Sequence, residues 1–126
     1  MKIISISLDD ETDIELKKMQ KQFNFKSRSK LLRSALNSML SEYRFLDSLK
    51  GHVDAVYMLT YKSDDKDRIS DILHEFEDLI KTAIHQHHVG ICFEILVVCA
   101  KAEQQKSLFS KLKKEKGIRS VKCSIL

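Results

Sequence analysis

The sequence predicts an α+β protein of two domains, a strand followed by two helices over residues 1–50 and a βαββαβ domain over residues 51–126. Two observations lead to this class. Before Gly51, one run of alternating residues is followed by two long apolar stripes at helical spacing. After Gly51, short alternating runs and helical stripes succeed one another. Because the chain has no proline and only three glycines, Gly51 is the expected boundary between the two domains.

The first domain begins with an expected strand over residues 2–8, in which alternate positions are apolar. Two amphipathic helices are expected next, over residues 10–23 and 29–49, and acidic residues open the first of them. No other strand is expected in this domain, and two short helices enclose only a small core. The segment is therefore expected to pair its strand with that of a second copy.

The second domain has the element order βαββαβ, which is that of a ferredoxin-like domain. Regulatory domains of the ACT type share this order, although a fold alone assigns no function. The expected elements are a strand over 53–61, a helix over 65–81, strands over 82–89 and 91–101, a helix over 103–116 and a strand over 118–125.

Basic residues are concentrated in the first domain. Residues 17–50 carry nine Lys or Arg against two Asp or Glu, whereas residues 51–126 carry twelve against eleven. This imbalance suggests a polyanion as partner of the first domain, although a solvated helical surface would give the same counts.

The composition also points to a cytoplasmic protein. The three cysteines are an odd number without disulfide spacing, and acidic residues follow the first eight residues directly, where a signal peptide would be apolar. No apolar run is long enough to predict a membrane span. The sequence lacks a Gly-rich phosphate loop, a nucleophile elbow and a plausible pair of catalytic carboxylates, so no enzyme is expected.

Four of the five histidines lie within fifteen residues, at positions 74, 85, 87 and 88. His85 and His87 are two residues apart on an expected strand, so they project to the same face. If residues 88–91 form a hairpin loop, Cys92 lies directly across from His87. Two imidazoles and a thiolate suit Ni, Cu, Zn or Co.

His74 lies on the expected helix over residues 65–81, at roughly 140° from Ile69 and the apolar stripe. It should therefore point away from its own sheet and reach a metal only together with ligands of another chain. The remaining candidates are expected to be structural or exposed, namely His52, His88, Cys99 and Cys123.

Residues 2–49 resemble the ribbon-helix-helix DNA-binding fold, with Ile4-Ser5-Ile6-Ser7-Leu8-Asp9-Asp10 as the strand entry. The resemblance implies an obligate dimer whose two-stranded ribbon enters the major groove of double-stranded DNA. Ile3, Ser5 and Ser7 would face the bases, although Ile3 departs from the usual polar or basic reader. The turn Ser27-Arg28-Ser29 resembles the family's phosphate clamp, and helix capping by these serines is compatible with that role.

The whole chain resembles the NikR-type nickel-responsive repressors, on the His-x-His pair, the downstream Cys and the eleven-residue step from His74 to His85. The resemblance implies a planar site for one Ni²⁺ per subunit, made by His85, His87 and Cys92 with His74 of a neighbouring subunit. Cu, Co or Zn would also bind in vitro. Cys92 comes one residue earlier than in the family pattern, consistent with a shorter hairpin loop.

The same resemblance implies a homotetramer, a dimer of dimers, that binds a palindromic operator and represses genes of nickel uptake. Two alternatives remain open at this point. One is an ACT-type sensor of a small organic ligand such as an amino acid, and the other is an antitoxin-like protein whose second half binds a toxin.

Overall fold

The computed structural model describes residues 1–126, apart from the side chain of Phe45. The chain divides into two compact units, Met1–Phe45 and Leu46–Leu126. Leu46 and Leu49, at the end of the second helix and just beyond it, pack against the core of the second unit.

The first unit contains helix α1 (Asp10–Gln22) and most of helix α2 (Arg28–Asp47). Each helix begins at a side-chain cap that satisfies a free backbone N–H group of its first turn. The Asp9 carboxylate accepts from the Thr12 N–H at 2.7 Å, and this hydrogen bond lowers the pKa of Asp9 below its ordinary value. The Ser27 hydroxyl accepts from the Lys30 N–H at 3.2 Å, so Ser27 acts as the cap of α2.

The expected strand over residues 2–8 is not formed within one chain, and residues 1–9 lie outside all helices and strands. A β-strand needs a neighbouring strand to hydrogen-bond with. The described sheet consists only of residues from the second unit, so residues 2–8 have no such neighbour in it. Both faces of the segment are open, since Ile3 is 93% and Ile4 is 74% exposed. Pairing of this segment with a second copy stays a prediction.

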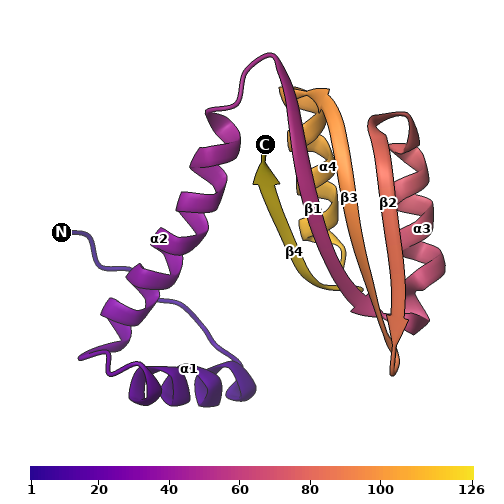
Figure 1. Ribbon diagram of the computed structural model, residues 1–126. Helices are drawn as coiled ribbons and strands as arrows, with labels where there is room; N and C mark the ends of the chain where they lie inside the picture. Colours follow the sequence, from indigo (N-terminus) through magenta and orange to yellow (C-terminus); the bar gives the residue numbers. More distant parts are fainter. The chain divides into compact units, whose positions relative to one another are not determined.

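The second unit has the expected order βαββαβ and forms one antiparallel sheet with the strand order β2-β3-β1-β4. Figure 1 shows α3 and α4 on the same side of this sheet. Its elements are β1 (His52–Lys62), a 3-10 helix (Ser63–Asp65), α3 (Lys66–Glu75), a 3-10 helix (Glu77–Leu79), β2 (Ile80–His88), β3 (Ile91–Lys101), α4 (Ala102–Lys114) and β4 (Ile118–Ile125).

The expected helix over residues 65–81 is wrong in its second half. Helix α3 ends at Glu75, a 3-10 turn follows, and β2 begins at Ile80, which pairs with Val98. Phe76, Leu79 and Ile80 are still packed against the core, but from the turn and the first residue of the strand. Their spacing matched a helix because a tight turn also brings residues three apart to the same side.

The core lies between one face of the sheet and the two helices. It includes buried side chains of the central strands, such as Tyr57, Leu59 and Leu96, and of the helices, such as Ile69 and Leu108. The opposite face carries a row in which Met58 pairs with Ile95 and Ile95 with Ile84. Met58 and Ile84 are 45% and 53% exposed, so this face of the sheet remains apolar and uncovered within the chain.

The polar side chain of Gln105 is fully buried in this core. The Gln105 amide accepts from the Tyr57 hydroxyl at 2.8 Å and donates to the carbonyl oxygens of Val53 and Val98, at 2.8 and 3.0 Å. Burial is also the main reason that the pKa of Tyr57 is raised well above its ordinary value. These hydrogen bonds join α4 to both central strands.

Replacing Gln105 by Leu should destabilise the protein by about 2–4 kcal/mol, because unpaired buried polar groups cost about 1–3 kcal/mol each. Urea unfolding followed by circular dichroism measures this loss. Gln104→Leu on the same helix is the matched control, since Gln104 accepts only the exposed Lys101 N–H. That control should cost about 1 kcal/mol or less. Equal losses of unfolding free energy in the two variants would show that the hydrogen bonds of the buried amide add no stability beyond that of an exposed one.

Candidate metal centre

A two-residue turn sets the register of the β2–β3 hairpin. Val89 and Gly90 have φ angles of 43° and 77°, as a type I′ turn requires at both central positions. His88 pairs with Ile91 and His87 with Cys92, so the loop is shorter than the expected residues 88–91. The cysteine therefore lies directly opposite the histidine.

The side chains of His87 and Cys92 approach one another across the hairpin. His87 Nδ1 lies 3.8 Å from Cys92 Sγ, and the hydroxyl of Ser63 lies 3.0 Å from the same nitrogen. The Cys92 thiol also faces the Ser63 oxygen at 4.0 Å. Cys92 is only 1% exposed, so its position is fixed by the packing of the central strand.

His85 projects to the same face of β2 as His87 and lies beside Glu94 of β3. Its Nδ1 is 2.8 Å from Glu94 Oε1, and Glu94 is the residue paired with His85 across the hairpin. The Tyr61 hydroxyl donates to the same carboxylate oxygen at 2.8 Å. Burial, followed by the hydrogen bond to Glu94, raises the pKa of Tyr61 well above its ordinary value, so Tyr61 remains a neutral donor.

His74 lies in the last turn of α3 with 76% of its side chain exposed, and its Nδ1 is 3.0 Å from Glu77 Oε2. This exposure agrees with the expectation that it points away from its own sheet. Among the described residues of one chain, no three His, Cys, Asp or Glu side chains form a group that could hold a metal ion. The structure thus brings His87 and Cys92 together and places His85 beside Glu94, but it does not gather all four expected ligands.

The other histidines and cysteines lie elsewhere. His52 Nε2 is 3.1 Å from Asp54 on β1, and His88 pairs with Ile91 next to the turn. Cys99 and Cys123 are half-buried cysteines on β3 and β4 and form no disulfide. An Asp54 hydrogen bond, followed by burial, raises the pKa of the Cys99 thiol.

The residues expected to contact DNA are placed in the first unit. Ile3, Ser5 and Ser7 are exposed in the segment before α1, and Ser29 is exposed in the first turn of α2. Arg28 is also exposed, and its guanidinium lies 3.9 Å from the Asp13 carboxylate.

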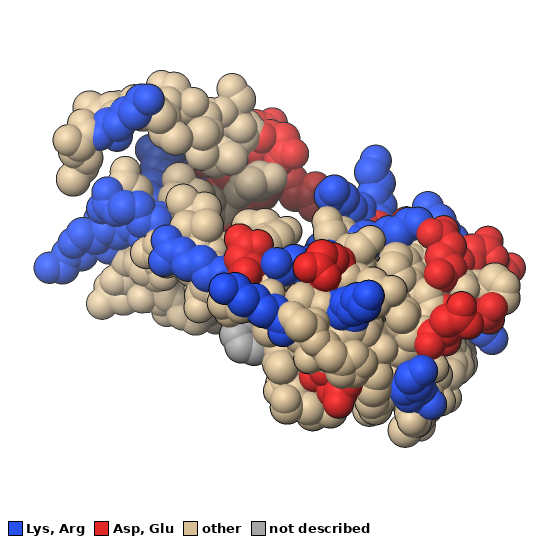
Figure 2. Space-filling model, turned by 90° about the horizontal axis from the view of Figure 1, so that it is seen from above, with Lys and Arg blue, Asp and Glu red and all other residues tan. Residues whose placement is uncertain are grey.

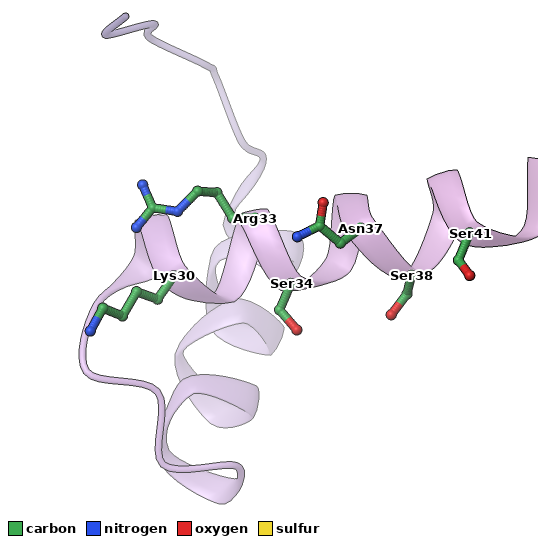
Figure 3. Close-up of a pocket in the computed structure, with 6 residues that line it drawn as sticks. All are labelled: Lys30, Arg33, Ser34, Asn37, Ser38 and Ser41. Carbon is green, nitrogen blue, oxygen red and sulfur yellow. The ribbon is translucent and has the colours of Figure 1, made fainter. Parts of the chain in front are cut away.

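A polar groove of about 670 Å³ runs along α2, lined by Lys30, Arg33, Ser34, Asn37, Ser38 and Ser41. In Figure 3 the two cationic side chains extend from the same end of the helix. The sequence predicted no role for Lys30 or Arg33. In Figure 2 basic side chains are interspersed with acidic and uncharged ones, so charge alone does not mark one binding face.

The donors that the structure does bring together fit a borderline metal ion. An imidazole nitrogen binds such an ion at about 2.0–2.1 Å and a thiolate at about 2.3 Å. His87 and Cys92, whose Nδ1 and Sγ atoms lie 3.8 Å apart, would therefore supply one nitrogen and one sulfur donor to such an ion. The combination of N and S donors is the one that Ni, Cu, Zn and Co prefer.

Comparison with known proteins agrees with this chemistry. Residues 51–126 match the family described as the NikR C terminal nickel binding domain. The chain belongs to the NikR family. This is a family of regulators rather than of enzymes.

Relatives named "Putative nickel-responsive regulator" match nearly the whole chain. That of Methanococcus maripaludis strain C7 is 29% identical over 98% of this chain and 90% of its own length. That of Methanocella arvoryzae is 27% identical over 94% of this chain and 88% of its own length. Similarity to the NikR family therefore extends over nearly the whole chain, beyond the nickel-binding domain alone.

Solved structures share the fold at lower identity. An uncharacterized protein of Thermotoga maritima superposes with a TM-score of 0.55 and 18% identity, covering 60% of this chain and 98% of that one. The ACT domain of a GTP pyrophosphokinase from Chlorobium tepidum gives a TM-score of 0.52 at 18% identity, covering 58% of this chain and 99% of that one. These likenesses support the ACT-like fold of the NikR domain. In the described part of the chain, no helix has both the length and the apolar character needed to cross a membrane.

Three residues near the expected ligands were not predicted from the sequence, namely Tyr61, Ser63 and Glu94. Glu94 had a usable signal, because it lies two residues after Cys92 and therefore projects to the same face of its strand. Tyr61 and Ser63 are at the end of β1, and their proximity follows only from the pairing of β1 with β3.

Two substitutions in the hairpin turn should change the stability of the protein in opposite directions. Val89→Asn should stabilise the protein by about 1 kcal/mol, because a β-branched residue is strained at positive φ and Asn-Gly is the favoured type I′ pair. Gly90→Ala should destabilise it by about 1–2 kcal/mol for the same reason. Urea unfolding measures both, and destabilisation by Val89→Asn would contradict the turn geometry.

Proposed function

We propose that this protein is a nickel-responsive, DNA-binding transcriptional regulator that represses genes of metal uptake. In this proposal the second domain binds one Ni²⁺ per subunit through His85, His87 and Cys92, with His74 supplied by a second copy. The first domain binds a palindromic operator in double-stranded DNA as a dimer. The complete assembly is a dimer of dimers in the cytoplasm.

The approach of His87 to Cys92 is the observation that carries the metal site. The two donors lie 3.8 Å apart in a domain that matches a nickel-binding family. A bound ion would connect the histidines of β2 to Cys92 of β3 and to His74 of a second copy. Cys92 would bind as a thiolate, and its burial on a central strand fixes the sulfur position.

Two surfaces support association with further copies. Met58, Ile95 and Ile84 form an apolar row on the sheet, and the exposed Met58 and Ile84 at its ends are of the kind that a folded partner covers. In the first unit, Leu36 and Met39 of α2 are 56% and 53% exposed. The exposure of His74 leaves its ring available to ligands of another chain.

The first unit supports DNA binding by its chemistry. The start of α2 presents backbone N–H groups and the positive end of the helix dipole, next to the exposed Arg28. Lys30 and Arg33 add two cations to the groove on the same helix. Phosphate contacts at this position would orient the unit, while Ser5 and Ser7 on the paired strands would read the bases.

Nickel titration of the metal-free protein tests the sensor site. The wild type should show a thiolate-to-metal charge-transfer band that saturates at one nickel per chain. Cys92→Ser should abolish the band and tight binding, because the hydroxyl cannot replace the thiolate as a soft donor.

Cys123→Ser is the matched control for this titration, since Cys123 is another cysteine of the same sheet but lies half-buried on β4, away from the hairpin. It should retain the band. A wild-type protein that binds no nickel would instead favour a sensor of a small organic ligand. Loss of the band in both variants would mean that replacing either cysteine disturbs the fold, and that Cys92 is not specifically the sulfur ligand.

Arg28→Ala should weaken binding to DNA of any sequence and reduce its dependence on salt. Each lost phosphate contact should lower the slope of log K against log salt by about 0.9. Fluorescence anisotropy with a labelled duplex, measured over a series of salt concentrations, gives this slope. Lys18→Ala removes a cation of equal exposure on α1, which is paired with Glu15, and serves as the control. Equal slopes for the two variants would contradict a phosphate contact at Arg28.

A further inference from the structure

The Nδ1 atoms of His85 and His87 have different neighbours, although both rings lie on one face of β2. Nδ1 of His85 faces the Glu94 carboxylate at 2.8 Å. Nδ1 of His87 faces the Ser63 hydroxyl at 3.0 Å and Cys92 Sγ at 3.8 Å. A neutral imidazole carries one proton, so these neighbours determine which nitrogen keeps a free lone pair.

For His85 the proton can be assigned by counting donors. A carboxylate only accepts. The Tyr61 hydroxyl lies 3.5 Å from His85 Nδ1, but it donates its single proton to Glu94 Oε1 at the shorter distance of 2.8 Å. His85 must therefore be the donor in its own contact with Glu94, which places its proton on Nδ1. Tyr61 is 1% exposed and the Glu94 side chain 13%, so water competes little for these groups. Nε2 of His85 then carries the free lone pair.

For His87 the order of donors is reversed. The Ser63 hydroxyl has one proton, and an imidazole nitrogen is a much stronger acceptor than a thiol sulfur. The favoured chain therefore runs from the Cys92 S–H to Ser63 Oγ, at 4.0 Å, and from the Ser63 O–H to His87 Nδ1. This arrangement places the His87 proton on Nε2 and leaves a lone pair on Nδ1, beside the sulfur.

The position of Ser63 is fixed independently of this contact. Its backbone N–H donates to the Gly90 carbonyl at 2.9 Å, which fastens the end of β1 to the hairpin turn. Ser63 also begins the 3-10 helix that leads into α3, the helix that carries His74. The hydroxyl is therefore held next to His87 by the main chain.

We infer that Glu94 and Ser63 are positioning residues that make the two histidines offer different ring nitrogens to a divalent first-row metal ion, Nε2 from His85 and Nδ1 from His87. The inference rests on the proposed nickel site for its purpose. The arrangement of protons itself belongs to the metal-free protein, and it can be measured without any metal.

Long-range ¹H–¹⁵N spectra of the metal-free, ¹⁵N-histidine-labelled protein test the assignment. His85 should show the Nδ1–H form and His87 the Nε2–H form, with signals assigned from His85→Asn and His87→Asn. The same tautomer at both rings would overturn the inference.

Glu94→Leu removes the acceptor that His85 and Tyr61 share, since both contact Oε1. The Tyr61 hydroxyl can then donate to His85 Nδ1, which lies 3.5 Å away, so His85 should change to the Nε2–H form and His87 should not. Ser63→Ala should leave His85 unchanged and give a mixture of forms at His87. Ser124→Ala, an exposed serine on β4, is the control and should alter neither ring.

Nickel affinity provides the second readout. Glu94→Leu and Ser63→Ala should each weaken nickel binding about 10–100-fold, as expected for partners of metal-ligating histidines. Retention of the Nδ1–H form of His85 in Glu94→Leu, or unchanged affinity in both variants, would overturn the inference even if the wild type binds nickel. A wild type that binds no nickel but shows the expected tautomers would instead remove the proposed function, and with it the metal-binding role assigned to Glu94 and Ser63.

Discussion

The register of one hairpin determines the chemistry of the second domain. A two-residue turn at Val89-Gly90 pairs His87 with Cys92 and His85 with Glu94. Since successive side chains of a strand alternate between faces, a shift of one residue would move both histidines to the opposite face of the sheet. The turn is therefore as necessary to the candidate site as its donor atoms, and a positive φ at two successive residues is what fixes it.

The residues of the candidate site differ in how firmly the surrounding packing holds them. Cys92 and Tyr61 are buried in the core on the central strands, and the half-buried Glu94 accepts from Tyr61. The buried Gln105 amide attaches α4 to the same strands. Ser63 connects this frame to α3 and to the hairpin turn. The polar groups that orient the histidines are thus more rigidly held than the histidines themselves, which suits a site whose geometry must select among metal ions.

Much of the second domain could be predicted from its sequence, because alternation and glycine positions mark its strands clearly. The bounds expected for β3 and β4 agree with the structure, and so does the opposition of His87 and Cys92. Helix α3 was overextended because helical spacing does not distinguish a helix from a tight turn before a strand. Ser63 lies 24 residues before His87, and only the order of strands in the sheet brings the two together. Pairing of residues 2–8 with a second chain stays a prediction from their alternation, because one chain alone does not form that strand.

The strand order places both histidines on β2, at the edge of the sheet, while Cys92 is on β3 with neighbours on both sides. Edge strands open locally at lower free energy than central ones. An ion shared by His87 and Cys92 would therefore cross-link the part of the domain that opens most readily to the part that opens least. Its effect would be felt chiefly as slower opening of β2 and its hairpin, so amide exchange along that strand would report occupancy of the site more directly than global unfolding.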